Sequence, residues 1–183
     1  MKNFFSFFFE IFKIAILALL IVLPIRYFVF QPFVVKGASM DPNFSEGDYL
    51  IIDELSYRFR EPERGEVIVF KYPLSPSQRF IKRIIGLPGE TIEMEDNKIT
   101  ILNEGKNEVL DESSYLLSNN FKKGKLKISL KEEEYFVLGD NRNASLDSRN
   151  FGLLPQKYII GRVLFRLWPI TNLKKFEAPA YVK

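Results

Sequence analysis

The chain begins with a long apolar stretch. Between residues 4 and 30 only three side chains are charged, those of Glu10, Lys13 and Arg26. A bilayer core of about 30 Å needs about 20 apolar helical residues. The run from 14 to 30 is long enough if a basic side chain at either end snorkels to the interface. The pattern therefore predicts that residues 1–30 form one transmembrane helix, in which Pro24 is tolerated.

Two other interpretations of this stretch are a cleaved signal peptide and a buried helix of a soluble protein. A signal peptide needs a small-x-small site after the apolar run, and RYFVFQPFVV offers none. Flanking charge does not fix an orientation, because Lys2 and Lys13 nearly balance Arg26 and Lys36. A retained membrane anchor is the interpretation that we favour.

Beyond residue 30 the pattern changes to short runs of β-branched and aromatic residues, separated by turn sequences such as EGD, RGE and GLPGE. Such runs are typical of strands. They occur at residues 33–35, 49–53, 66–72, 79–86, 91–94, 98–102, 125–130, 134–139 and 158–169. No helical periodicity extends beyond a few residues. Residues 31–183 are predicted to form one mainly β, antiparallel domain.

One part of this domain is more polar than its surroundings. Residues 93–134 contain charged blocks such as NEGKNE, FKKGK and KEEE. We predict a peripheral β-ribbon or small subdomain there, inserted between two halves of the core.

Composition narrows the chemistry that the chain can perform. It contains no cysteine and no histidine, which excludes disulfides, thiol nucleophiles, Ser-His-Asp triads and imidazole zinc sites. A net charge of +3, with acids and bases interleaved, gives no indication of nucleic-acid binding. Proton transfer in an enzyme of this composition would fall to Lys, Asp, Glu or Tyr, and we predict neither a metal nor a cofactor.

Ser39, in the segment KGASMDPNF, is the first candidate for chemistry. Gly37 and Ala38 leave room for a substrate backbone to approach. A serine is a weak nucleophile without a base, and most serines in such tripeptides are ordinary loop residues. Lys36 would lie on the opposite face of an extended chain, and a carboxylate such as Asp41, with a pKa of about 4, is a poor base toward an alcohol.

Lys82 is a better candidate for the base. It lies in the apolar run RFIKRIIG, and burial disfavours the ammonium form and lowers a lysine pKa. Lowering the pKa by about 3 corresponds to about 4 kcal/mol, which is within the range of buried lysines. The simpler alternative is that Lys82 snorkels to solvent from a strand.

The segment GDNRNASLDSRNFG, residues 139–152, follows the predicted strand EYFVL. Its two aspartates and two arginines could pair with one another, and its serines could form local hydrogen bonds. A solvated turn with incidental ion pairs is the alternative. The residues concerned are Asp140, Arg142, Ser145, Asp147, Ser148 and Arg149.

Five segments of the chain, taken in order, resemble the motifs of bacterial type I signal peptidase (leader peptidase). They are GASMDP, EGDYLIID, RGEVIVFKYP, FIKRIIGLPGE and GDNRNASLDSRNFG. They extend from Gly37 to Gly152, and IIGRVLFRLWP and FVFQPFVVKGASM are also similar to the family. Residues 93–134 contribute nothing to the resemblance. It implies a signal-peptidase-type β fold and a membrane-bound serine endopeptidase with a Ser-Lys dyad.

The resemblance also implies a role for each matching residue. Ser39 would be the nucleophile and Lys82 the general base, with Ser145 hydrogen-bonded to the Lys82 amine. Asp147 and Arg149 would hold the loop that carries Ser145. The residues lining shallow pockets for small substrate side chains would be Phe33, Val35, Phe80 and Ile81.

Two departures from the family pattern bear on the site. Some members have a serine two residues before the nucleophile that helps to bind the oxyanion, whereas this chain has Gly37. The Ser39 N–H would remain as one donor. Phe44, at a position where the family often has leucine, could narrow a substrate pocket.

The resemblance further implies where the enzyme acts. Its substrates would be exported preproteins, cleaved beside the lipid at the outer face of the cytoplasmic membrane by a single-pass protein with an extracytoplasmic catalytic domain. Ser39 lies nine residues beyond Phe30 and so at most about 30 Å from the membrane edge. The rival interpretations are a cytosolic Ser-Lys autoprotease of the SOS-repressor type and an inactive, membrane-tethered β scaffold that binds exported peptides.

Overall fold

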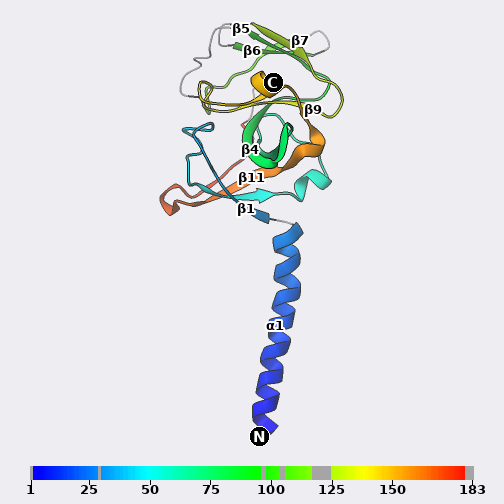
Figure 1. The fold of residues 1–183 in the computed structure, drawn as a ribbon, viewed down its shortest axis with the longest axis vertical. Helices are drawn as coiled ribbons and strands as arrows, with labels where there is room; N and C mark the ends of the chain where they lie inside the picture. The colour runs from blue at the N-terminus through cyan, green and yellow to red at the C-terminus, as the bar shows by residue number, and fades with distance from the viewer. Residues whose placement is uncertain (1, 29, 96–97, 104–105, 117–124, 180–183) are drawn as a thin grey trace.

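A computed structural model describes residues 2–28, 30–95, 98–103, 106–116 and 125–179. Helix α1 (Lys2–Phe28) contains no glycine, continues through Pro24, and projects from the β domain. The domain begins directly after it, at β1 (Figure 1). Large apolar side chains are exposed around the helix: Phe7, Phe8, Phe9, Ile11, Phe12, Ile14, Ile16, Leu17, Leu19, Leu20 and Val22.

Among the described residues, no helix is both long enough and apolar enough to cross a membrane.

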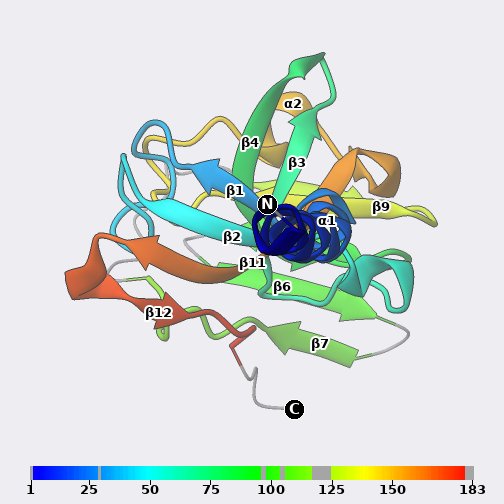
Figure 2. The same ribbon diagram turned by 90° about the horizontal axis from the view of Figure 1, so that it is seen from below.

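The main sheet has eight strands, and every pair in it is antiparallel. The prediction of a mainly antiparallel β domain is therefore confirmed. The strand order is β1-β2-β11-β3-β4-β9-β10, with β12 paired to β11. Their bounds are β1 (Phe30–Val34), β2 (Tyr49–Asp53), β3 (Val67–Tyr72), β4 (Ser75–Gly86), β9 (Glu134–Leu138), β10 (Leu154–Pro155), β11 (Ile159–Trp168) and β12 (Lys174–Lys175). Figure 2 shows the hairpin of β3 and β4 projecting from the sheet.

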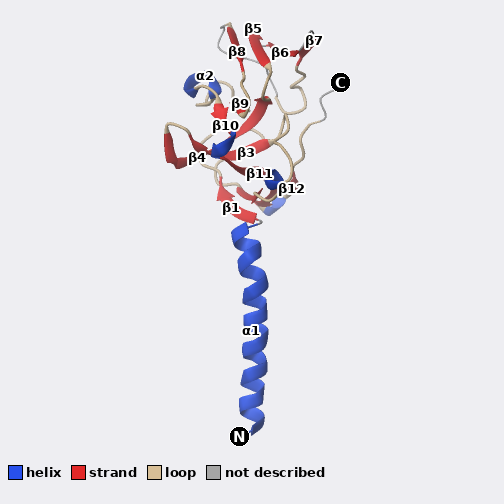
Figure 3. Ribbon diagram, turned by 90° about the vertical axis from the view of Figure 1, so that its right-hand side faces the viewer, coloured by secondary structure: helices blue, strands red, loops and turns tan. Residues whose placement is uncertain are grey.

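A second sheet lies on the side of the main sheet that is remote from α1 (Figure 3). Its order is β7 (Lys106–Val109), β6 (Lys98–Asn103), β5 (Thr91–Glu95) and β8 (Leu126–Ser129). Alternation along β5 and β6 turns one face inward, where Ile92 and Ile101 are almost fully buried. This face packs on Phe136 and Leu138 of the main sheet. The segment 93–134, predicted as a peripheral insert, contains β6, β7, β8 and the end of β5, and its residues 96–97, 104–105 and 117–124 lie outside the described residues.

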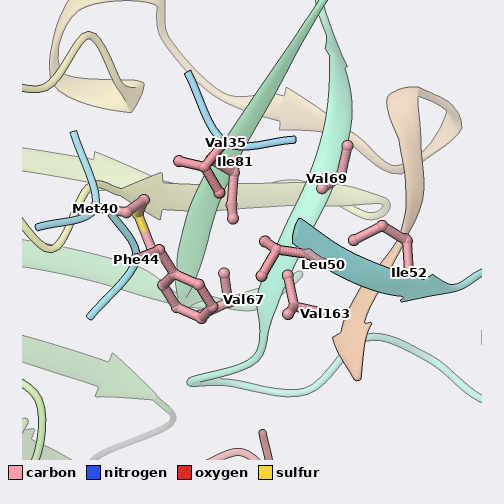
Figure 4. Packing of buried hydrophobic residues seen from close by; sticks show 9 residues of the cluster. All are labelled: Val35, Met40, Phe44, Leu50, Ile52, Val67, Val69, Ile81 and Val163. Carbon is pink, nitrogen blue, oxygen red and sulfur yellow. The ribbon is translucent and has the colours of Figure 1, made fainter. Parts of the chain in front are cut away.

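Both faces of the central strand β3 are buried along Val67–Phe70, so this part of the strand lacks a polar face. Along β3, Val67 and Val69 belong to one hydrophobic cluster, whereas Ile68 and Phe70 belong to another. Figure 4 shows the first cluster, in which Met40 and Phe44 from the loop after β1 lie against the strands. Burial of apolar surface here fixes the position of that loop.

The elements absent from the sequence prediction are short or polar. Strands β10 and β12 have two residues each, and β7 is the polar edge segment KNEV. Helix α2 (Ser148–Phe151) is a single turn. Single 3-10 turns occur at Ser56–Arg58, Gln156–Tyr158 and Ile170–Asn172. Segments of this length carry too few residues to show a period.

Candidate active site

Ser39 lies in a loop whose ends are held by backbone hydrogen bonds. The N–H of Val35 donates to the carbonyl of Asp48 at 3.0 Å, and the N–H of Gly47 donates to Val35 at 3.0 Å. Gly37 has a φ of 78°, a conformation that glycine adopts without strain. Next to Ser39, Met40 is fully buried. The buried Met40 side chain and the backbone hydrogen bonds therefore hold the loop in place, while Ser39 itself is half-buried.

Lys82, on β4, lies next to Ser39. Its side chain is 3% exposed, and its Nζ donates to Ser39 Oγ at 2.8 Å and to the carbonyl oxygen of Ile81 at 2.8 Å. The Phe80 ring centroid is 5.4 Å from Nζ. The fold thus brings together two polar groups that are 43 residues apart in sequence.

Burial lowers the pKa of Lys82 to about 8 from an ordinary value of 10.5. The negative charges of Asp147 and Asp140 oppose this change but do not cancel it. The lowering corresponds to about 3 kcal/mol of destabilisation of the ammonium relative to the amine. At neutral pH roughly a tenth of such lysines are uncharged, against a few in ten thousand for a free lysine.

The segment after β9 is bonded directly to the Ser39 loop. The Asn141 N–H donates to the carbonyl of Ser39 at 3.0 Å, and its Nδ2 donates to the carbonyl of Ala38 at 3.0 Å. Asp147 accepts hydrogen bonds from the Gly139 N–H at 3.1 Å and from Arg149 Nε at 2.8 Å. Asp147 also caps α2, so both ends of the loop that carries Ser145 are held.

Ser145 lies in this loop, but its expected hydrogen bond to Lys82 is not formed. Its Oγ is buried and has no hydrogen-bond partner among the described residues. The hydrogen bonds of Lys82 Nζ run to Ser39 and Ile81. The Oγ of Ser145 instead occupies the space that a β-carbon on Gly139 would need.

Gly139 must lack a side chain for these segments to come together. A β-carbon at this position would overlap both Ser145 Oγ and the carbonyl oxygen of Ser39. We expect Gly139→Ala to push the Ser39 loop away and to lower kcat on the order of 100-fold, because small misplacements of reacting groups are that costly. Steady-state kinetics on the folded variant would measure this.

Gly89→Ala is the matched control for Gly139→Ala. Gly89 has a φ of 81°, so an alanine there is also strained, but a β-carbon would meet no atom within 4 Å. We expect lower stability with unchanged kcat. Equal kcat values for the two variants would contradict the role given to Gly139.

A groove of about 650 Å³ runs past Ser39 and Lys82. Three of the four predicted pocket residues, Phe33, Phe80 and Ile81, line it. Val35 does not, because it is 1% exposed and packs in the core. Phe44 does not narrow the groove either, since it is fully buried and lies against Phe176 with ring centroids 4.4 Å apart. The remaining lining residues are Val34, Lys36, Gly37, Ala38, Ser39, Ser77, Gln78, Arg79, Lys82, Ala144 and Leu146.

The acids and bases of 139–149 do not all pair with one another as expected. Asp147 pairs with Arg149, but Asp140 pairs with Arg83 at 2.7 Å and Arg142 pairs with Glu112 at 2.5 Å. Alternation along β4 places Arg83 on the face opposite Lys82, a signal that was present in the sequence. Nothing in the sequence indicated Glu112, which lies in the polar insert.

Among the described residues there is no group of three or more acidic side chains arranged to hold a metal ion. The arrangement consists of an alcohol, a buried amine and a groove beside them. An amine in its neutral form can take a proton from the alcohol, and an alcohol so activated can attack a carbonyl carbon.

Comparison with known proteins identifies one family. Residues 8–168 match the model of signal peptidase, peptidase S26. A probable signal peptidase I-2 of Synechocystis sp. is 36% identical over 169 residues, which cover 90% of this chain and 75% of that protein. A signal peptidase I of Bacillus licheniformis is 34% identical over 179 residues, covering 92% and 93%. The crystal structure of a signal peptidase I from Enterococcus faecalis V583 is 35% identical, with a TM-score of 0.46, and covers 56% of this chain and 97% of that one.

Proposed function

This chain belongs to the signal peptidase family, peptidase S26, and on that premise we propose that it removes amino-terminal signal peptides with a Ser39–Lys82 dyad. It is a serine endopeptidase of the type I signal peptidase class, and its substrates are preproteins that carry signal peptides. The assignment of residues to catalytic steps is our proposal.

One observation carries the assignment. A serine hydroxyl and a nearly fully buried lysine amine lie 2.8 Å apart at the side of a groove. A nucleophile and its base must lie within hydrogen-bond reach. Burial supplies the remaining requirement, because it favours the neutral form of Lys82.

The reaction would proceed in two stages. Lys82 Nζ takes the proton of Ser39 Oγ as that oxygen attacks the scissile carbonyl, and the lysine ammonium then protonates the departing amine. The neutral amine next takes a proton from the water that attacks the ester, and the resulting ammonium returns a proton to Ser39 Oγ as the signal peptide leaves with a free carboxyl group. The Ser39 N–H would donate to the oxyanion in both stages.

The groove supports binding of an extended peptide with small side chains beside the scissile bond. Phe33, Phe80 and Ile81 provide an apolar wall, and Ala38 and Ala144 also line the groove. A wall of this kind excludes large side chains by steric overlap. We propose that Phe33, Phe80 and Ile81 select small residues in substrates, and that Asp147 and Arg149 support the loop around Ser145.

Signal peptidase I relatives imply a membrane-associated enzyme. We propose that residues 1–30 are its single anchor in the cytoplasmic membrane and that 31–183 form an extracytoplasmic catalytic domain beside the lipid. Exposed apolar side chains around α1 support an apolar environment for that helix. Because β1 follows α1 directly, Ser39 would act close to the bilayer surface.

The function is tested with the purified full chain in phospholipid vesicles and a preprotein that has alanine at the last and third-last positions of its signal peptide. We expect release of the mature protein, with its amino terminus identified by mass spectrometry. Replacing the last alanine by leucine should lower kcat/KM by about 100-fold or more, because the apolar wall leaves no room for it.

The same assay separates the rival functions. A Ser-Lys autoprotease would cleave its own chain and leave the preprotein intact, and an inactive scaffold would bind the preprotein without cleaving it. Either result, or cleavage indifferent to leucine at the last position, would contradict the proposed function.

A further inference from the structure

Residues 110–116, which we call the clasp, leave the second sheet and reach the elements that carry the candidate active site. The clasp begins at Leu110, whose N–H donates to the carbonyl of Ile99 at 2.8 Å. It then forms one turn, in which the N–H groups of Tyr115 and Leu116 both donate to the carbonyl of Glu112. Glu112 is 2% exposed and Tyr115 is 7% exposed. A carboxylate buried this deeply needs partners.

The main partner of Glu112 is Arg142, in the loop after β9. Arg142 donates from Nη1 to Glu112 Oε2 at 2.9 Å and from Nη2 to Oε1 at 2.5 Å, and the Tyr115 hydroxyl donates to Oε1 at 2.7 Å. The third donor of the same guanidinium, Nε, donates to the carbonyl of Gly139 at 2.8 Å. Glu112 therefore orients a side chain that holds the backbone of Gly139, next to Ser145 and Ser39.

Tyr115 contacts the two other segments of the site. Its ring lies beneath the Arg83 guanidinium, 4.1 Å from the ring centroid. Arg83 follows Lys82 on β4 and pairs with Asp140. The carbonyl of Tyr115 accepts a hydrogen bond at 2.7 Å from Nδ2 of Asn43, which lies within the Ser39 loop.

The clasp thus contacts all three segments that carry the site: the Ser39 loop, strand β4 and residues 139–149. Asn43 joins the Ser39 loop to residues 139–149, because its Nδ2 also donates to Asp140 Oδ2 at 2.9 Å. The hydrogen bonds of Glu112 and Arg142 are buried and those of Asn43 are partly buried. Buried polar groups with defined partners specify one arrangement most strongly.

We propose that Glu112 and Tyr115 are positioning residues for catalysis, through which the second sheet holds the Ser39 loop, β4 and the 139–149 loop in register. This inference rests on the proposed function. Glu112 acts through Arg142 and Gly139, and Tyr115 acts through Arg83 and Asn43. Neither residue lines the groove, so the proposal predicts an effect on kcat rather than on KM.

The test is Glu112→Gln, with kcat, KM and the melting temperature measured on the full chain in vesicles with the preprotein described above. Gln keeps the shape but loses the charge that Arg142 requires. At assay temperatures well below the melting temperature, we expect kcat to fall 10-fold or more, whereas KM should change by less than about 2-fold. Glu108→Gln, an exposed position on β7, is the matched control and should leave kcat and KM unchanged.

Two further variants keep the test decisive if Glu112→Gln does not fold. Tyr115→Phe retains the ring over Arg83 and should lower kcat less than about 3-fold, whereas Tyr115→Leu removes the ring and should lower kcat 10-fold or more. Adding Arg142→Gln to Glu112→Gln should cause little further loss of kcat, because the two side chains act as one unit.

The proposal is overturned if Glu112→Gln or Tyr115→Leu lowers the melting temperature while kcat of the folded protein stays at the wild-type value. That result would leave the clasp with a purely structural role. An inactive wild-type chain would instead refute the proposed function, so the two failures are distinguishable.

Discussion

Ser39→Ala is expected to abolish cleavage of the preprotein. The substitution removes the oxygen that would form the acyl-enzyme, and loss of a nucleophile of this kind lowers kcat by about 10⁴-fold or more. Folding should be retained, because Ser39 is only half-buried and Lys82 keeps its hydrogen bond to the carbonyl of Ile81. The rate of mature-protein release at saturating substrate, measured alongside the melting temperature, checks both expectations.

Ser129→Ala is the control for this variant. Ser129 lies on β8 in the second sheet and its hydroxyl is hydrogen-bonded to that of Thr91 at 2.8 Å. The Ser129→Ala variant should cleave the preprotein at the wild-type rate. Preprotein cleavage that persisted at that rate in Ser39→Ala would show that another group is the nucleophile.

Lys82→Met is expected to be equally inactive but at least as stable as the wild type. Methionine fills a similar volume without an amine, so Ser39 loses its base and kcat falls by about 10⁴-fold. The stability expectation follows from linkage. The pKa of Lys82 is about 8 when folded and 10.5 when unfolded, so the unfolded chain binds more protons between these values.

The cost of burying this lysine, about 3 kcal/mol, is therefore fully present below pH 8 and disappears as the pH rises to 10.5. Urea unfolding should show wild-type stability rising over that interval and Lys82→Met lacking this rise. Lys98→Met, an exposed lysine on β6, should match the wild type in activity and in pH dependence. An active Lys82→Met protein would remove Lys82 from the mechanism.

The sequence was sufficient to predict the strands that are runs of β-branched and aromatic residues and the residues with distinctive chemistry. The runs YLIID and EVIVFKY predicted β2 and β3. The absence of histidine and cysteine left a buried lysine as the best base. The pairing of Ser39 with Lys82 then depends on strands that meet only in the folded domain.

Other features could not be predicted because they depend on long-range packing. Val35 was predicted to line a substrate pocket, but its side chain packs in the hydrophobic core. Arg142 finds its carboxylate in Glu112, 30 residues away and in a polar insert without any motif. The charge pattern of residues 139–149 left the pairing of its aspartates and arginines open. Asp147 and Arg149 were singled out by the resemblance to the family, and they pair within this segment.

The most direct test of the proposed mechanism is the titration of the Lys82 amine itself. In protein with isotope-labelled lysine side chains, the Lys82 signal can be assigned by its absence from Lys82→Met and followed by NMR as the pH is raised. We expect a midpoint near pH 8. A midpoint for Lys82 near 10.5 would mean that the amine is charged at neutral pH and cannot serve as the base.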